Sequence, residues 1–119
     1  MITQATSRQV EPDITVIAIA GRLNLGNTLM SLENDIRKQI QNGAKKIVFD
    51  LTNLEYIDSA GIGMLVGISG QAGQSGGQVR VAGAKGGVAQ AFHVVHMERI
   101  MPLDGDIDES TRHLAAYNS

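Results

Sequence analysis

The fold class is decided by the stretch Lys45-Lys46-Ile47-Val48-Phe49-Asp50-Leu51, whose β-branched and aromatic centre predicts a buried strand. Just before it, residues 26–42 carry apolar side chains three and four positions apart, which predicts an amphipathic helix closed by Gly43. Residues 14–20 form a nearly continuous apolar run, which predicts another strand, buried on both faces. A strand, helix, strand order predicts a right-handed parallel crossover, and therefore an α/β sheet.

Towards the N-terminus, Val10-Glu11-Pro12-Asp13 is typical of a turn, because proline presets φ at the second turn position and aspartate is tolerated at the third. The turn separates a weaker strand, at about residues 2–10, from the strand at residues 14–20. Gly21 is predicted to end this second strand. The chain is therefore expected to begin with a hairpin.

Towards the C-terminus, a second helix is predicted to begin at Ser59, with a loop at residues 72–77. Gly63, Gly67 and Gly70 lie within this helix, and each costs about 1 kcal/mol relative to alanine in a helix interior. We expect a close approach of the helix to the sheet to compensate.

The rest of the chain continues the alternation of strands and helices. Residues 78–82 alternate between apolar and polar side chains, as a half-buried strand does. A helix over residues 86–96, a short edge strand near Pro102 and a last helix over residues 106–117 follow. We expect one α/β domain over residues 1–119, with a mixed sheet of four to five strands and about four helices.

Composition excludes several function classes. The chain has 119 residues, no cysteine and a net charge of -2, without a basic stripe of the kind that nucleic-acid binding needs. The absence of cysteine excludes thiolate nucleophiles and cysteine-ligated zinc and fits a reducing cytoplasm. No signal peptide or membrane-spanning apolar run is recognised, so we expect a cytoplasmic protein without a membrane anchor.

The most informative residues are Tyr56-Ile57-Asp58-Ser59-Ala60-Gly61, because they lie at a strand-to-helix turn, where partners of α/β proteins collect. In one interpretation, the Ser59 hydroxyl caps the helix by accepting an N–H bond. In the other, Ser59 is presented to a kinase at the rim of the protein. A phosphate there would be stabilised by helix N–H groups and would place about 1.5 to 2 negative charges beside Asp58.

The stretch Ile57-Asp58-Ser59-Ala60-Gly61-Ile62-Gly63-Met64-Leu65, preceded by Ile47-Val48-Phe49-Asp50-Leu51, resembles the signature of the anti-sigma factor antagonists, the bacterial branch of the STAS domain family. The resemblance extends over nearly the whole chain. It implies that the unphosphorylated protein binds an anti-sigma factor and so frees a sigma factor. The anti-sigma factor is itself a serine kinase that phosphorylates the serine corresponding to Ser59, and a separate phosphoserine phosphatase reverses this.

The resemblance implies a substrate and ligand rather than an enzyme, with no cofactor. The expected partner-binding residues are Asn24, Asp58, Ser59, Ala60, Gly61 and Met64. Many relatives have aspartate where this chain has Asn24, which keeps hydrogen bonding and removes a charge. The alternative is a constitutive structural or accessory STAS subunit of a larger regulatory or transport assembly, in which Ser59 only caps a helix.

Other candidate sites have simpler interpretations. A hydrolase triad of Ser59 with His93 or His96 lacks a suitably placed acid and a nucleophile elbow, and the two histidines have no third metal ligand nearby in sequence. Residues 104–109 resemble a calcium loop but lack its glycine and glutamate, so helix capping by Asp106 or Asp108 is expected instead. Residues 83–87 lack P-loop spacing. The methionines Met64, Met97 and Met101 could line an adaptable docking surface, but core filling is the more common role of a methionine and is expected for most of them.

Overall fold

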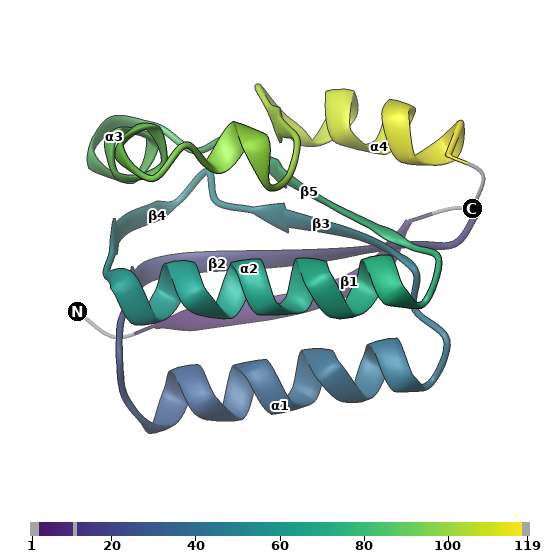
Figure 1. Ribbon diagram of the computed structural model, residues 1–119, viewed down its shortest axis with the longest axis horizontal. Helices are drawn as coiled ribbons and strands as arrows, with labels where there is room; N and C mark the ends of the chain where they lie inside the picture. Colours follow the sequence, from purple (N-terminus) through teal and green to yellow (C-terminus); the bar gives the residue numbers. More distant parts are fainter. Residues whose placement is uncertain (1–2, 11, 118–119) are drawn as a thin grey trace.

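The computed structural model describes residues 3–10 and 12–117. Strands and helices alternate along most of the chain (Figure 1). The elements are β1 (Gln4–Val10), β2 (Ile14–Leu23), α1 (Asn27–Gln41), β3 (Lys46–Asp50), β4 (Leu54–Ile57), α2 (Ser59–Gln74), β5 (Gln78–Ala82), α3 (Gly86–Val94), a 3-10 turn (Met97–Arg99), β6 (Leu103–Asp104) and α4 (Ile107–Ala115).

The six strands form one sheet in the order β1-β2-β3-β5-β6, and β4 pairs with the end of β2. Only the β1–β2 pair is antiparallel, and the other pairs are parallel. The predicted α/β class and N-terminal hairpin are confirmed, with one strand more than the four to five expected. Ile2 and Glu11, which fall in the predicted first strand and turn, lie outside the described residues.

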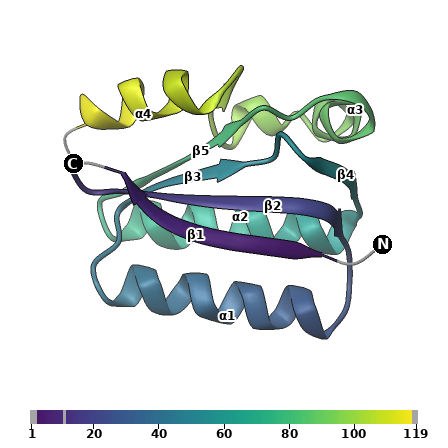
Figure 2. The same ribbon diagram turned by 180° about the vertical axis from the view of Figure 1, so that it is seen from behind.

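The helices cover both faces of this sheet. Helices α1 and α2 pack together on one face, and α4 lies on the other (Figures 1 and 2). Helix α3 packs against β4, and the 3-10 turn packs against α3. Both contribute to the main core, which includes the fully buried Phe49, Leu65, Ile68 and Phe92. A smaller cluster lies beneath α4, and its buried members are Ile14, Val16, Val48, Ala82 and Leu114.

Strand β2 does not end at Gly21, so that prediction was wrong. Gly21 has a φ of 83°, a conformation that glycine adopts without steric cost, and the strand continues to Leu23. The register shifts between Gly21 and Arg22, and the Gly21 N–H donates to the Asn53 carbonyl at 3.1 Å. The last residues of β2 thereby pair with β4, which leads directly into α2.

Two helix ends also differ from the prediction. Helix α2 begins at Ser59 as predicted, but it continues to Gln74, because the apolar Ala72 side chain is buried in the core. The expected loop therefore begins later. Helix α3 ends at Val94 rather than at residue 96, and His96 adopts a left-handed conformation, with a φ of 55°, before the 3-10 turn.

Buried methionines fill gaps in the core, as predicted. Met64, Met97 and Met101 are at most 3% exposed. Within residues 3–10 and 12–117, no helix has the length and apolar character needed to cross a membrane.

A buried polar contact fixes β6 and α4 against β5. The guanidinium of Arg80 donates to both carboxylate oxygens of Asp104, at 2.6 and 2.9 Å, and the Ser110 hydroxyl donates to the same carboxylate at 2.6 Å. These side chains are largely buried. The Arg80 bond lowers the pKa of Asp104, and this effect exceeds the opposing effect of burial.

Candidate functional site

The candidate site lies where β4 passes into α2, and Asp58 organises it. Asp58 is the N-cap of α2, and its Oδ1 accepts a hydrogen bond from the Gly61 N–H at 2.9 Å. Its Oδ2 accepts from the Leu25 N–H at 3.0 Å, in the loop between β2 and α1. One carboxylate therefore ties the start of α2 to a loop that is more than thirty residues earlier in the sequence.

The same contacts keep the Asp58 carboxyl ionised. Burial, the largest single effect, raises its pKa, but the backbone N–H groups around it, those of Leu25 and Gly61 first, together outweigh burial and lower the pKa. A negative charge therefore lies beside Ser59 at neutral pH.

Ser59 is the first residue of α2, and its side chain is exposed. The N-cap position belongs to Asp58, so the interpretation in which the Ser59 hydroxyl caps the helix was wrong. In the described part of the chain, no side-chain hydrogen bond involves this hydroxyl. Its oxygen is therefore accessible, and no structural contact would be lost if it were modified.

The start of α2 packs tightly on the end of β2 at Gly61. A Cβ atom on Gly61 would lie 2.6 Å from the Leu23 carbonyl oxygen and 2.8 Å from the Ile57 side chain, which no substituted residue could accept without movement. Glycine is thus required for close helix–strand contact here, although the sequence pointed to other positions for that contact.

The three glycines predicted to approach the sheet do not do so. A Cβ on Gly63 or Gly70 would meet nothing within 4 Å, and one on Gly67 would meet only the Arg37 side chain of α1, at 2.8 Å. The prediction was wrong because the apolar period of α2 is weak, so the sequence did not show which glycine faces the sheet.

The predicted partner-binding residues fall into two groups. Asn24, Asp58 and Ala60 are half-buried, and Ser59 is exposed. Asp58 bonds to the residues on either side of Asn24, so these four lie in one region. Gly61 and Met64 are buried, and the Met64 side chain is only 3% exposed. In this conformation neither residue presents a side chain to a partner, and Met64 belongs to the core.

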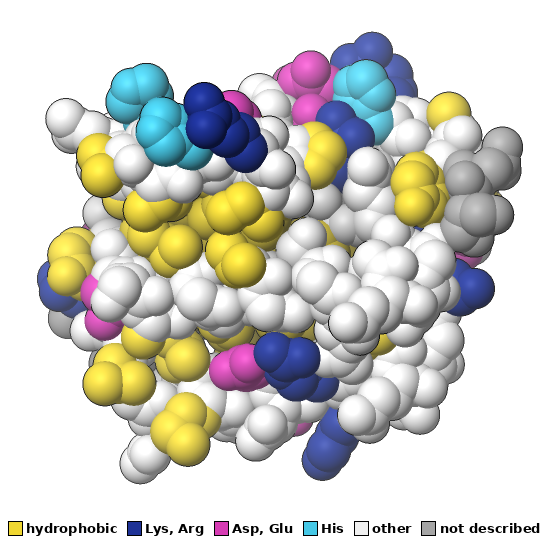
Figure 3. Space-filling view, viewed as in Figure 1, with side chains coloured by type: hydrophobic (Ala, Val, Ile, Leu, Met, Phe, Trp, Pro, Cys, Tyr) yellow, Lys and Arg dark blue, Asp and Glu magenta, His cyan; other side chains and the backbone are white. Residues whose placement is uncertain are grey.

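Two large exposed apolar side chains were missed, one in the loop before α1 and one in the first turn of that helix. Leu25 is 74% exposed and Met30 is 56% exposed, and hydrophobic side chains gather at the corresponding corner of the surface (Figure 3). The Asp58 bond to the Leu25 backbone places Leu25 next to Ser59. The sequence offered a signal for Met30 alone, because Met30 lies outside the apolar period of α1, which runs through Leu29, Ile36 and Ile40. Leu25 continues that period by its spacing, but it precedes the helix, which begins at Asn27.

The main alternative sites carry no comparable chemistry. Asp106 caps α4 by accepting from the Glu109 N–H at 2.8 Å, which confirms the capping prediction. Asp104, Glu109 and His113 have ligand atoms close to one another, but Arg80 already occupies both Asp104 oxygens.

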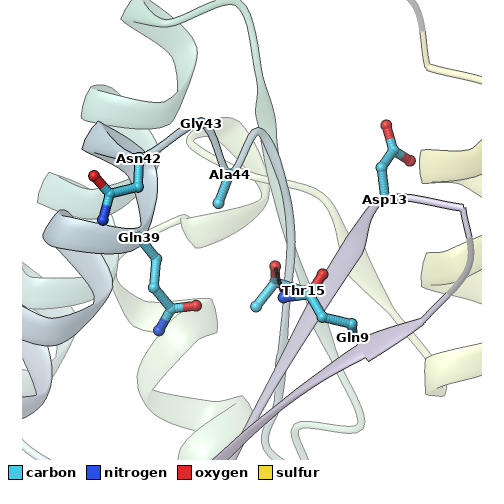
Figure 4. Close-up of a pocket in the computed structure, with 7 residues that line it drawn as sticks. All are labelled: Gln9, Asp13, Thr15, Gln39, Asn42, Gly43 and Ala44. Carbon is cyan, nitrogen blue, oxygen red and sulfur yellow. Dashed lines mark hydrogen bonds between the residues drawn. The ribbon is translucent and has the colours of Figure 1, made fainter.

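A polar hollow of about 360 Å³ lies at the opposite end of β2 (Figure 4). It is lined by Gln9, Asp13, Thr15, Gln39, Asn42, Gly43 and Ala44.

Comparison with known proteins gives consistent matches. The STAS domain family model matches residues 5–110. The anti-sigma-B factor antagonist of Staphylococcus aureus is 25% identical over 88 residues, which cover 74% of this chain and 81% of that protein. The similarities to solved structures that follow concern the fold alone.

An anti-sigma factor antagonist from Mycobacterium paratuberculosis superposes with a TM-score of 0.82 at 19% identity, covering 96% of this chain and 95% of that one. The unphosphorylated form of SpoIIAA gives 0.75 at 18% identity, covering 96% and 100%. Its phosphorylated form, from Bacillus, gives 0.74 at 19% identity, covering 92% and 98%.

Proposed function

The chain belongs to the STAS domain family, and on this premise we propose that it is an anti-sigma factor antagonist regulated by phosphorylation at Ser59. The unphosphorylated form binds an anti-sigma factor, which is a serine kinase, and so releases a sigma factor. A phosphoserine phosphatase restores the binding form. The observation that carries the proposal is the exposed Ser59 side chain on the first residue of α2, next to an Asp58 carboxylate that already caps the helix.

The position of Ser59 suits a phosphorylation switch. A helix N-terminus stabilises an anion through its unpaired N–H groups and the helix dipole, so the phosphate can be accepted without refolding α2. It would add about 1.5 to 2 negative charges next to the ionised Asp58. A partner that docks over this turn would then meet a strongly altered electrostatic field.

The surface around Ser59 suits a protein partner. Leu25 and Met30 supply exposed apolar area close to a rim of polar groups that includes Asn24. Interfaces commonly combine a buried apolar anchor with a polar surround, and the anchor contributes most of the binding energy. We therefore propose that Leu25 and Met30 anchor the anti-sigma factor and that Ser59 lies within the contact.

On this proposal the protein catalyses nothing and acts as ligand and substrate. Among the described residues no histidine bonds to the Ser59 hydroxyl, and the Asp58 carboxylate is directed to backbone N–H groups rather than to an imidazole, so the arrangement of a nucleophilic serine is not formed. The proposed site of action is the cytoplasm, because sigma factors and their regulators act on transcription there.

The phosphorylation step is tested by intact mass after incubation with the cognate anti-sigma factor and ATP. The wild type should gain one phosphate, and Ser59→Ala should gain none. Ser75→Ala, which changes an exposed serine at the other end of α2, is the matched control and should behave as the wild type. Phosphate on Ser59→Ala, or no phosphate on any form, would contradict the proposal and favour the accessory-subunit alternative.

The docking surface is tested by titrating anti-sigma factor with Leu25→Asp and Met30→Asp. Each change should weaken binding by about 2 kcal/mol or more, as loss of an apolar anchor does. Ile100→Asp, which changes an exposed apolar side chain just after the 3-10 turn, is the control. Equal weakening by all three variants would show that the partner does not dock at the Ser59 end.

A further inference from the structure

The two edges of the sheet differ in how they are protected. At the β5 edge, the Val81 N–H donates to the Pro102 carbonyl and the Gly83 N–H to the Asp104 carbonyl. The Tyr117 hydroxyl donates to the Gly77 carbonyl at 3.2 Å. The opposite edge is β1, whose outer side faces away from the rest of the sheet (Figure 2).

The register identifies the backbone groups that β1 leaves open. The Gly21 N–H points towards β4, so the odd-numbered residues of β2 face β3 and β4 and the even-numbered ones face β1. The even-numbered residues of β2 therefore bond to the even-numbered residues of β1, since Thr6 pairs with Ala18 and Arg8 with Val16. The N–H and C=O groups of Ala5, Ser7 and Gln9 therefore point outwards. They form the pairs of the β1–β2 ladder that exchange no hydrogen bond, and in the part of the chain that the structure describes β1 pairs with no strand other than β2.

Strand β1 lacks the features that normally protect an edge. Such strands are short, bulged, or interrupted by proline or lysine. Strand β1 pairs with β2 along seven residues without a register shift, has no glycine, proline or lysine, and carries a single charge, at Arg8. All its side chains are exposed except that of Val10, so burial in the monomer contributes little to ordering it.

We propose that this edge pairs with β1 of a second copy of the same chain, antiparallel, about a two-fold axis at Ser7. This inference does not depend on the proposed function. The outward groups of Ala5, Ser7 and Gln9 are symmetric about Ser7. Ser7 therefore exchanges both of its hydrogen bonds with Ser7 of the copy, and Ala5 exchanges both of its own with Gln9 of the copy.

The side chains are compatible with this pairing. Arg8 would lie opposite the uncharged Thr6 of the second copy, and Gln4 opposite Val10. The two Arg8 side chains would be diagonal neighbours, roughly 7–8 Å apart at their backbones, so their repulsion is weak and screened by salt. The contact area is small and polar, and the dimer is therefore weak and concentration-dependent. A heterologous extended peptide has no such symmetry to match, which favours the second copy.

Disulfide trapping tests the register directly, because the chain contains no cysteine. In the dimer the two Ser7 Cα atoms are about 5.5 Å apart, within reach of a disulfide. The two Gln4 Cα atoms are roughly 20 Å apart, which no disulfide can span. Under mild oxidation, Ser7→Cys should form a covalent dimer about tenfold faster than Gln4→Cys, since only its thiols are held together. Equal rates would overturn the proposal.

Sedimentation of the full chain tests the contact without covalent chemistry. The wild-type mass should rise towards that of two chains over about a hundredfold range of concentration. Ser7→Pro removes one outward N–H from each copy, and an edge strand tolerates proline at such a position, so it should remain monomeric with an unchanged circular dichroism spectrum. Arg8→Gln should dimerise several-fold more strongly. A wild type that stays monomeric, or a Ser7→Pro dimer, would overturn the proposal.

Discussion

At the scale of single residues, Asp58 has two separable contacts, which substitution can distinguish. Asp58→Asn keeps one acceptor oxygen for the Gly61 N–H but presents an amide to the Leu25 N–H, whereas Asp58→Ala loses both bonds. We expect destabilisation of about 1 kcal/mol for asparagine and about 2 kcal/mol for alanine, measured by urea unfolding. Equal stability of the two variants would show that the Gly61 bond contributes nothing, and an asparagine variant as stable as the wild type would show the same of the Leu25 bond.

Gly61 gives a second prediction at this scale. Gly61→Ala places a Cβ against the Leu23 carbonyl and should destabilise the protein by about 1–3 kcal/mol, as overpacking does. The matched control in the same helix is Gly70→Ala, which meets nothing within 4 Å and should stabilise the protein by up to about 1 kcal/mol. Thermal unfolding of both variants is the measurement, and shifts of the same sign would contradict it.

At the scale of elements, the Arg80–Asp104 pair makes the attachment of β6 and α4 pH-dependent. Arg80 lowers the pKa of Asp104 in the folded protein below the unfolded value of about 3.9. The pair therefore contributes its full stability above pH ~4, and this contribution is lost as the pH falls through the lower folded value. We expect acid titration followed by circular dichroism to show this loss in the wild type and not in Asp104→Asn.

The same pair predicts a non-additive double substitution. Asp104→Asn leaves the Arg80 charge buried without its carboxylate and should cost about 3 kcal/mol, whereas the exposed Asp35→Asn should be nearly neutral. Arg80→Met combined with Asp104→Leu should recover most of the loss, because apolar replacements of buried pairs are often neutral. A double variant that is as unstable as the sum of its parts would contradict this.

Sequence periodicity located most elements, and it failed where distant contacts decide the outcome. Strand β4 has four residues, of which Glu55 and Tyr56 are exposed, so no alternation marks its bounds. The extension of β2 past Gly21 depends on pairing with β4, and the extension of α2 depends on burial of Ala72. The candidate site was likewise predicted only in part. The turn at Ser59 was recognisable, but the Asp58–Leu25 bond, which joins the two segments, was not.

At the scale of the whole molecule, the proposed switch should change binding without changing the fold. Ser59→Ala and Ser59→Asp alter an exposed side chain that makes no hydrogen bond within the described residues. The free energy of unfolding of each variant should therefore lie within about 0.5 kcal/mol of the wild-type value. Ser59→Asp should bind the anti-sigma factor more weakly than Ser59→Ala by a few kcal/mol, because a new negative charge disturbs an interface that is complementary to the uncharged serine. Equal affinities in calorimetric titration would contradict the switch.

The bond between Asp58 and the Leu25 amide also gives the protein an internal spectroscopic reporter. An amide proton held by a carboxylate has a resonance frequency that depends on the length of that bond and on the charge around it. A phosphate on Ser59 would add negative charge beside this bond. The Leu25 cross-peak in an amide NMR spectrum should therefore move on phosphorylation, although Leu25 is distant in sequence and is not itself modified.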